Sequence, residues 1–471
     1  MNRIVSMAWR NIWRNKRRTL ITASSIFFAV FFAILMRSFQ LGTYSHMIKQ
    51  SIEMFSGYLQ VQNPDYFDDP NLDNSFELSP DVLKIIQTTP GIKVAVPRIE
   101  SFALASTGHQ SKGIIVTGID PLKEKQISNP EHMLVHYKLT PELVAAVLKE
   151  TNLPKKQQEL LTLHQNSIYN NLDRLALDLG LKSSEIKPYR AVFEKHFKFP
   201  GTHLTPDDKG VLISYKLSQF LRVSVGDSLV LIGQGYHGNS AAGLFPVRGI
   251  VHVPSPDLDN KLIYMTLSMA QHFYSLDNHI TSVVLNLTDA GQMEAIQTSL
   301  SNRLPKDQYL VKNWQEINPV LKQQIEGDNK SGQIFIGILY LIIFFGIFGT
   351  VLMMITERKR EFGVLVAIGM RKRVLVTVVV LEMFFLGLIG TVSGMMAAIP
   401  LVLGFNANPV RITGNMAKMY EDMGFDPVMP TAPIEHYFAW QALIILVMVL
   451  AACYIPLNRI RNIKIVKALK G

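Results

Sequence analysis

The sequence predicts a membrane protein with four transmembrane helices, one before and three after a large α+β domain that lies outside the cytoplasm. Apolar residues make up 48% of the 471-residue chain, and they gather in four runs long enough to cross a bilayer. The excess of lysine and arginine lies in three short segments beside these runs, which marks the cytoplasmic ends. The longest polar segment, between the first two runs, alternates strand and helix patterns.

Hydropathy divides the chain from end to end. An interfacial helix over 1–18 leads into the first span, 19–39, and the extracytoplasmic domain occupies 40–330. The remaining segments are a second span at 331–356, a cytoplasmic connector at 357–373, a third span at 374–405, an outer loop at 406–437, a fourth span at 438–457 and a cytoplasmic tail at 458–471.

The placement of charge excludes nucleic acid as the expected partner. Lysine and arginine number 47 against 37 acidic residues, a net charge of +10 that by itself would suggest nucleic-acid binding. The excess instead lies in 1–18, 357–373 and 458–471, where the positive-inside rule requires it. Both termini are therefore expected in the cytoplasm. The one cysteine, Cys453, falls in the last span, so no intramolecular disulfide is possible.

The extracytoplasmic domain is predicted to be interrupted. Residues 40–120 show a strand, helix, strand, strand pattern, and a matching pattern returns at 279–330. We expect these halves to pair into one α+β unit, with 121–278 inserted between them. The insertion begins with a helical part, 131–197, and continues as short strands. A Gly-Asp pair at 226–227, between two β-branched runs, predicts a hairpin.

No motif in the sequence predicts catalysis. A phosphate-cradling G-x-x-x-x-G-K-[ST] loop does not occur, and H-E-x-x-H, C-x-x-C and G-x-S-x-G are also missing from the sequence. We therefore predict no catalytic residues, no metal ligands and no cofactor, and we expect that the chain is not an enzyme. If ATP drives this protein, the ATPase must be a partner.

The connector 357–373 is the predicted site of contact with that partner. It is short and basic, and its middle offers a helix with an apolar face on which a protein can dock. Phe362 and Leu365 are expected to fill a groove on the partner, and Gly369 is expected to end the helix. The candidate coupling residues are Glu357, Arg358, Arg360, Glu361, Phe362, Gly363, Leu365 and Gly369.

The third span carries one acid and a series of glycines. Glu382 lies about two turns beyond the connector, at a depth where an ionisable group is costly. It either pairs with a basic residue or backbone donor of the bundle, or carries protons. Gly387, Gly390 and Gly394 follow it. Gly390 and Gly394 form a G-x-x-x-G face that permits close packing of helices.

Several motifs together resemble a known family. They are AWRNIWRNKRRT at 8–19, VTGIDP at 116–121, VGD at 225–227, ERKREFGVLVAIGMRKR at 357–373, Glu382 with the glycines after it, and the ending YIPLNRIRNIKIVKALKG. In these the chain resembles the permease subunits of ABC transporters of the FtsX/MacB/Lol superfamily, and most of all the lipoprotein-releasing (Lol-type) permeases.

The resemblance implies an inner-membrane protein of bacteria that works as a dimer, with itself or with a paralogue, and with a separate ABC ATPase. It implies mechanotransmission to a lipoprotein or similar envelope client, with a periplasmic carrier as a further expected partner. It also implies a Porter-like subdomain, from 40–120 and 279–330, and an inserted Sabre-like subdomain, 121–278. Two departures are the absence of a fused ATPase and the long helical insert 131–197.

Two other classes of function stay open at this point. An FtsX-like permease can switch an extracytoplasmic wall hydrolase without transporting anything, and such a chain would show the same spans and connector. A stand-alone channel is disfavoured, because the spans hold only one acid and no repeated polar face.

Overall fold

The structure is a computed structural model, and it describes residues 2–14, 16–182, 185–253, 255–412, 414–422 and 427–461. The chain forms two compact units. The helical unit takes residues 1–47, 320–414 and 427–471, and the α/β unit takes residues 48–319 and 415–426. The end of the predicted cytoplasmic tail, from 462 onward, lies outside the described residues.

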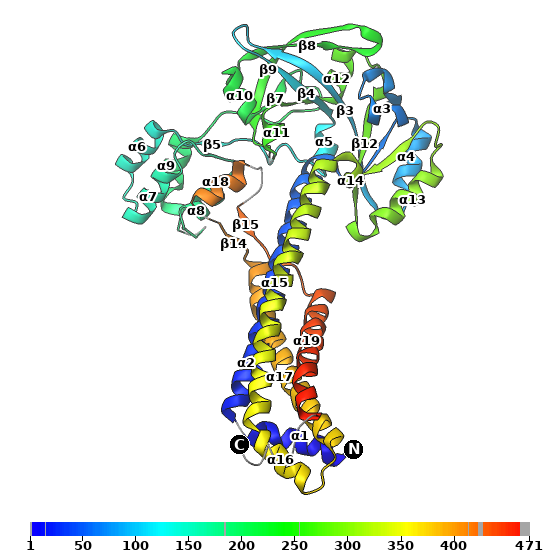
Figure 1. Ribbon diagram of the computed structural model, residues 1–471. Helices are drawn as coiled ribbons and strands as arrows, with labels where there is room; N and C mark the ends of the chain where they lie inside the picture. Colours follow the sequence, from blue (N-terminus) through cyan, green and yellow to red (C-terminus); the bar gives the residue numbers. More distant parts are fainter. Residues whose placement is uncertain are drawn as a thin grey trace. The chain divides into compact units, whose positions relative to one another are not determined.

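The helical unit consists of long helices, with the shorter helices α1 and α16 at one end (Figure 1). Its elements are α1 (Asn2–Arg14), α2 (Lys16–Ile48), α15 (Pro319–Glu357), α16 (Lys359–Ala367), α17 (Lys372–Ala407), α19 (His436–Arg461) and the strand pair β14 (Val410–Arg411) and β15 (Val428–Met429). By length and composition, four helices within the described part of the chain can cross a membrane: α2, α15, α17 and α19. One precedes the α/β unit in sequence and three follow it, which confirms the predicted fold class.

Two spans continue as helix beyond their predicted ends. The first was expected to end at 39 and the second to begin at 331. The structure extends α2 to Ile48 and begins α15 at Pro319, which makes α15 a continuous helix of 39 residues. Proline suits the first turn of a helix, because the N–H that it lacks has no partner there. The first span therefore continues as helix up to the α/β unit, and the second span begins as helix directly after it.

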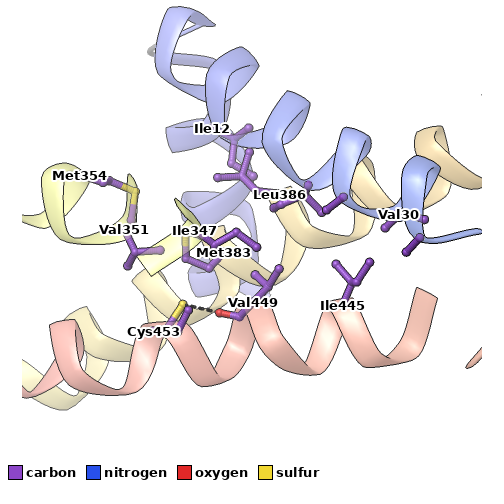
Figure 2. Close-up of a cluster of buried hydrophobic side chains, with 14 of the residues drawn as sticks. Ile12, Val30, Ile347, Val351, Met354, Met383, Leu386, Ile445, Val449 and Cys453 are labelled. Atoms are coloured by element: carbon purple, nitrogen blue, oxygen red, sulfur yellow. Dashed lines mark hydrogen bonds between the residues drawn. The ribbon is translucent and has the colours of Figure 1, made fainter. Parts of the chain in front are cut away.

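Apolar side chains from every span meet in the core of the helical unit (Figure 2). The fully or almost fully buried residues include Ile12 of α1, Val30 of α2, Ile347, Val351 and Met354 of α15, Met383 and Leu386 of α17, and Ile445, Val449 and Cys453 of α19. Cys453 donates its S–H to the Val449 carbonyl at 3.1 Å. It acts as a packing residue within its helix, and α1 belongs to the same core as the spans.

The α/β unit contains one large sheet and several small helices. Its strands are β1 (Leu59–Gln62), β2 (Phe76–Glu77), β3 (Ile92–Ser106), β4 (Ser111–Ile119), β5 (Tyr137–Lys138), β6 (Ile168–Tyr169), β7 (Val211–Ser214), β8 (Ser228–Gln234), β9 (Ser240–Val251), β10 (Leu262–Thr266), β11 (His279–Ile280), β12 (Ser282–Leu287) and β13 (Leu310–Asn313). Its helices are η1 (Lys49–Ser56), α3 (Pro64–Asp68), η2 (Leu72–Asn74), α4 (Pro80–Gln87), α5 (Pro121–Glu124), α6 (Pro141–Glu150), α7 (Lys155–Leu163), α8 (Leu172–Asp178), α9 (Lys187–Phe197), α10 (Tyr215–Leu221), η3 (Tyr236–Gly238), α11 (Pro256–Asp259), α12 (Leu267–Tyr274), η4 (Ala290–Gln292), α13 (Met293–Arg303), α14 (Trp314–Ile317) and α18 (Asn415–Asp422).

The nine strands of the large sheet run in the order β13-β1-β12-β3-β4-β10-β7-β9-β8. Because β8 also pairs with β3, the strands from β3 to β8 in this order close into a ring. The long strand β3 makes this possible: its first part pairs with β12 and its last part, Ala103 to Ser106, pairs with β8. Strands of the inserted segment and strands of the two flanking halves thus belong to one sheet.

The hairpin predicted at residues 226–227 is wrong. The preceding apolar run forms α10, whose buried residues Leu217, Ser218 and Leu221 follow helical spacing. The turn at Gly226 therefore joins a helix to β8. The hairpin of this region is formed instead by β8 and β9, and it closes where the Gly235 N–H donates to the Asn239 carbonyl.

The helices of residues 131–197 form a group with their own core (Figure 1). Side-chain caps begin two of them: Thr140 accepts from the Leu143 N–H at the start of α6, and Asn171 accepts from the Arg174 N–H at the start of α8. Phe193 and Phe197 of α9 are buried among the leucines of α6, α7 and α8. This group is thus a packed helical subdomain.

Candidate coupling site

The predicted connector contains the short helix α16, held between two spans. One residue, Arg358, separates α15 from Lys359, the first residue of α16. Gly369 follows the helix with a φ of +105°, a conformation that glycine adopts without strain. The N–H of Met370 donates to the Leu365 carbonyl at 3.0 Å, which closes the end of the helix. The C-terminal end of α16 is therefore defined by its sequence.

The apolar face of α16 points into the bundle, which corrects the expected role of Phe362. That side chain is only 1% exposed and belongs to the core of the helical unit, so it is not available to a groove on a partner. Leu365 is partly buried against the same core, and Gly363 is buried. The physical reason is that the bundle itself offers an apolar surface next to the connector, and α16 packs on it.

A different side of α16 is open. Val364 is 41% exposed and Ile368 is 79% exposed. Lys359, Arg360 and Glu357 are also exposed. Arg360, Val364 and Ile368 follow one another at four-residue intervals, so one open side of the helix combines two aliphatic side chains with a cation. The sequence indicated that the helix is amphipathic, but the helix has apolar residues on more than one side, and only the packing decides which side stays free.

Glu382 forms an ion pair with the connector. Arg358 Nη1 donates to Glu382 Oε2 at 2.6 Å, and both side chains are less than a tenth exposed. Asn11 of α1 donates its Nδ2 to the other oxygen, Glu382 Oε1, at 2.5 Å. The expected pairing of Glu382 with a basic residue is thus present. A buried carboxylate with two donors has its charge compensated in place.

The ion pair is part of a network of five side chains. Arg358 Nε also donates to Glu361 Oε2 at 3.2 Å, and Arg14 Nη2 donates to the same oxygen at 2.5 Å. Partial burial opposes ionisation of Glu361, but the two guanidinium groups outweigh it and hold its pKa below the usual range. Since Asn11 and Arg14 lie on α1, the network ties α1, α16 and α17 together.

Asn11 and Arg14 were not among the candidate residues. They lie one turn apart on a basic helix, and this spacing alone is a weak indication of a functional role. Their partners are more than 340 residues away in the sequence. An acid in a span does require donors, so the need for such residues was foreseeable. The identity of the donors depends on how α1 packs, and the edge-on contact of Trp9 with Phe385, 5.5 Å between centroids, helps to fix that packing.

The glycines of α17 are points of close helix contact. A Cβ at Gly390 would lie 2.7 Å from Ile26 Cβ and 2.9 Å from the Ala23 carbonyl oxygen of α2. A Cβ at Gly394 would lie 2.8 Å from the Phe27 carbonyl oxygen. Gly387 faces α19 instead, where a Cβ would lie 3.0 Å from a side-chain carbon of Leu446. The first span therefore packs on the third through bare backbone.

In the α/β unit, the chain enters from α2 and leaves toward α15 at neighbouring strands. Helix η1 and Gly57 join α2 to β1, and α14 joins β13 to α15. The strands β1 and β13 are antiparallel partners, with Leu59 opposite Asn313. The Trp314 N–H donates to the Tyr58 carbonyl at 3.0 Å just beyond that pair. The connections to the first two spans thus meet at one end of one strand pair.

A buried ion pair fixes η1 to the sheet. Arg98 of β3 and Glu124 of α5 are both fully buried, and Arg98 Nε donates to Glu124 Oε2 at 3.2 Å. Burial opposes the charge on Arg98, but Glu124 raises its pKa, so the guanidinium stays charged. Arg98 Nη1 donates to the Phe55 carbonyl of η1, and the guanidinium lies 5.4 Å from the Phe55 ring centre. The charged side chain of Arg98 therefore anchors η1, the segment that follows the first span, to the sheet.

The helical unit matches a known family over much of its length. Residues 333–465 match the model described as FtsX-like permease C-terminal. This range contains α16, α17, most of α15 and the described part of α19, and so it includes the Arg358–Glu382 pair. The chain carries an FtsX-like permease domain. The match confirms the resemblance to the FtsX/MacB/Lol superfamily that the motifs indicated.

Curated relatives of this chain are similar at modest identity. The chain is 23% identical over 231 residues to "Lipoprotein-releasing system transmembrane protein LolC" of Neisseria meningitidis serogroup B, covering 47% of this chain and 55% of that protein. It is 23% identical over 274 residues to LolC of Xylella fastidiosa strain 9a5c, covering 57% and 66%. It is 30% identical over 160 residues to "ABC transporter permease YtrF" of Bacillus subtilis, covering 32% and 35%. The chain thus spans about half the length of the first relatives that it matches.

Two solved structures are similar at lower identity. The extracellular domain of the noncanonic ABC-type transporter YknZ aligns with 55% of this chain at 13% identity and a TM-score of 0.27. The periplasmic region of MacB from Actinobacillus actinomycetemcomitans aligns with 60% of it at 12% identity and a TM-score of 0.31. At TM-scores this low, neither likeness bears on the function of the chain.

Proposed function

We propose that this chain is the permease subunit of an ABC transporter in the bacterial inner membrane, driven by a separate ATPase that docks on α16. The client is a lipoprotein or a similar envelope molecule. The family match, the names of the curated relatives and the absence of a nucleotide-binding motif from the sequence support this proposal.

The observation that carries the proposal is the network that holds α16. A helix without contacts to the bundle could be displaced without moving the spans. Here Arg358, the residue before α16, links Glu361 of α16 to Glu382 of α17, and Phe362 is buried in the core. A displacement of α16 is therefore passed to the spans, because the core is close-packed and transmits strain.

The proposed docking surface is the open side of α16, around Val364 and Ile368. Both are exposed aliphatic side chains in the cytoplasmic connector, and Arg360 lies nearby in the same helix. Apolar residues that fill a partner's groove, with charges at the rim, are the usual composition of a binding hot spot. This surface replaces Phe362 and Leu365 in the coupling role.

The path from α16 to the α/β unit runs along continuous helix. The helix α15 extends without a break from Glu357 next to α16 to Pro319 next to α14. The helix α2, which packs on α17 at Gly390, continues to Ile48 and then into η1. Motion of the bundle would thus reach the sheet through two helices, and this supports mechanotransmission as the mode of action.

Orientation and assembly are part of the same proposal. The basic segments beside the spans favour both termini and α16 in the cytoplasm, and the α/β unit outside. The resemblance to Lol-type permeases favours a dimer, with a second copy or a paralogue. It also favours an outer partner that carries or receives the client.

The test uses the complex purified from its own membrane with its ATPase and reconstituted into vesicles. We expect Val364→Asp and Ile368→Asp to keep the protein folded but to lose co-purification of the ATPase and client-stimulated ATP hydrolysis. The control is Leu122→Asp, which alters a 62% exposed leucine in the α/β unit. Wild-type coupling in both connector variants would overturn the proposed docking surface.

The client is tested separately by crosslinking from the α/β unit in cells, followed by mass spectrometry. Recovery of a lipoprotein or of a lipoprotein carrier supports the proposal. Recovery of a wall hydrolase in place of either would replace it with the regulatory function, while leaving the ATPase contact intact.

A further inference from the structure

A cavity of about 500 Å³ lies among α2, α15 and α19 within the helical unit. It takes no part in the coupling network. Its polar lining includes Arg37 of α2, Tyr340 of α15, and Trp440 and Gln441 of α19, and Gly337 forms part of its wall. Arg37 lies in the second half of α2 and Trp440 in the first turns of α19, so the cavity is near the ends of these helices that lead toward the α/β unit in sequence.

Arg37 brings a positive charge that forms no ion pair with a carboxylate of the described residues. Its Nη1 donates to Gln40 Oε1 at 2.6 Å and to Asn329 Oδ1 at 3.1 Å, and both acceptors are neutral amides. Among the residues that the structure describes, no carboxylate lies within ion-pair distance of Arg37. A cation in a span is costly unless an anion accompanies it. Within the described ranges its Nε and Nη2 have no hydrogen-bond partner, and they can donate to an anionic ligand.

A second donor faces the same space. The Tyr340 hydroxyl donates to Gln441 Oε1, which orients the amide of a side chain that is only 8% exposed. The carbonyl oxygen of Gln441 is thus occupied, and its N–H groups are the ones left to bind a ligand. Arginine and a side-chain amide together suit the oxygens of a phosphate, since the guanidinium fork binds phosphate in bidentate fashion.

Apart from Gln333 of α15, the rest of the lining is apolar or aromatic. Ile336 and Ile444 form an aliphatic wall, and the Trp440 ring is 61% exposed beside it. Tryptophan and tyrosine are the residues that favour the level of lipid headgroups. A phosphate-binding end joined to an aliphatic wall at this level matches an amphiphile with an anionic head and an acyl chain.

We propose that this cavity binds one anionic glycerophospholipid, with its phosphate on Arg37 and Gln441 and one acyl chain along Ile336 and Ile444. A volume of about 500 Å³ holds the head, the glycerol and the start of a chain, and the remainder of the lipid stays in the bilayer. The site is distinct from the ATPase contact and does not depend on the identity of the client.

The test is native mass spectrometry of the full chain, released from detergent after addition of phosphatidylglycerol or phosphatidylcholine. We expect one phosphatidylglycerol to remain bound under activation that removes phosphatidylcholine. Arg37→Gln should weaken this retention about tenfold, the effect of losing one strong charged contact. Lys330→Gln, the same charge change at an exposed site of α15 outside the cavity lining, should leave it unchanged.

A second pair of variants tests the cavity without altering charge. A Cβ at Gly337 meets no atom within 4 Å, so Gly337→Leu fills the cavity without straining the bundle, and it should abolish retention of the lipid. Gly346→Leu is the control, because that position in α15 is equally open and does not line the cavity. If Arg37→Gln does not fold, the comparison of Gly337→Leu with Gly346→Leu still tests whether the lipid binds in the cavity.

Three results would overturn the proposal. Equal retention of phosphatidylglycerol and phosphatidylcholine would show that the headgroup charge is irrelevant. Displacement of the lipid by inorganic phosphate alone would identify a site for the free anion. Full retention in Gly337→Leu would place the lipid outside the cavity.

Discussion

Arg358 and Glu382 are buried partners, and the loss of Arg358 leaves the Glu382 carboxylate with the neutral Asn11 as its remaining donor among the described residues. We expect Arg358→Met to lower the free energy of unfolding by about 3 to 5 kcal/mol, the cost typical of breaking a buried pair. The double variant Arg358→Met with Glu382→Leu should cost clearly less than the sum of the two single changes, because it leaves no unpaired charge. Unfolding in detergent, followed by temperature or denaturant, measures both effects.

Arg14 provides the matched comparison within the same network. Its side chain is 60% exposed, and its pair with Glu361 is open to solvent. Exposed pairs contribute little, so Arg14→Met should cost less than about 1 kcal/mol. Equal losses for Arg14→Met and Arg358→Met would contradict the burial of the Glu382 site.

Gly390 and Gly394 allow α17 to approach the backbone of α2. A leucine at either position would have to displace the carbonyl oxygens of Ala23 or Phe27, which lie under 3 Å from the new Cβ. We expect Gly390→Leu or Gly394→Leu to lower the free energy of unfolding by about 1 to 3 kcal/mol. Gly404→Leu, in open space on the same helix, is the control. Unchanged melting of the first two variants would show that α2 does not pack there.

Among the elements, α16 shows how far sequence reasoning reaches. Its position between two spans and its end at Gly369 follow from hydropathy and from the needs of a helix end. The direction of its apolar face does not, because Phe362, Val364, Leu365 and Ile368 spread over more than one side of a short helix. Packing in three dimensions selects Phe362 for the core and leaves Ile368 open.

The two faces of α16 predict opposite results for two alanine variants. Phe362→Ala removes a buried ring from the core and should lower the free energy of unfolding by about 3 kcal/mol. Ile368→Ala changes a side chain that is 79% exposed, and its effect on unfolding should stay within about 0.5 kcal/mol. Thermal melting of the two proteins in detergent decides the point. A stable Phe362→Ala protein would mean that this ring faces outward after all.

For the whole molecule, the positions of the membrane spans could be predicted from the sequence, but the order of the strands in the large sheet could not. A run of about 20 apolar residues has few alternatives to a membrane helix, so composition alone located all four. Strand partners are set by contacts far apart in sequence. Residues 97–98 of β3, for example, pair with residues 282–283 of β12, while the end of β3 pairs with β8. Local patterns therefore predicted many of the strands but not the ring that they close.

The orientation of the whole chain is open to a direct test. In a background with Cys453→Ala, single cysteines replace the exposed residues Ser240 and Arg360. The positive-inside rule predicts that a membrane-impermeant maleimide labels Ser240→Cys in intact spheroplasts. It predicts that Arg360→Cys reacts only after the membrane is permeabilised. The reverse pattern would show that the α/β unit faces the cytoplasm.

The pairing of Leu59 with Asn313 has a mechanical consequence. The chain coming from α2 enters β1 at this pair, and the chain going to α15 leaves β13 at the same pair. If both helices move together, β1 and β13 travel as one body and no hydrogen bond between them changes length. If one helix moves against the other, β1 must slide along β13 and break the hydrogen bonds of their register. The strand pair would thus follow a motion that the two helices share, and it would resist a sliding of one helix against the other.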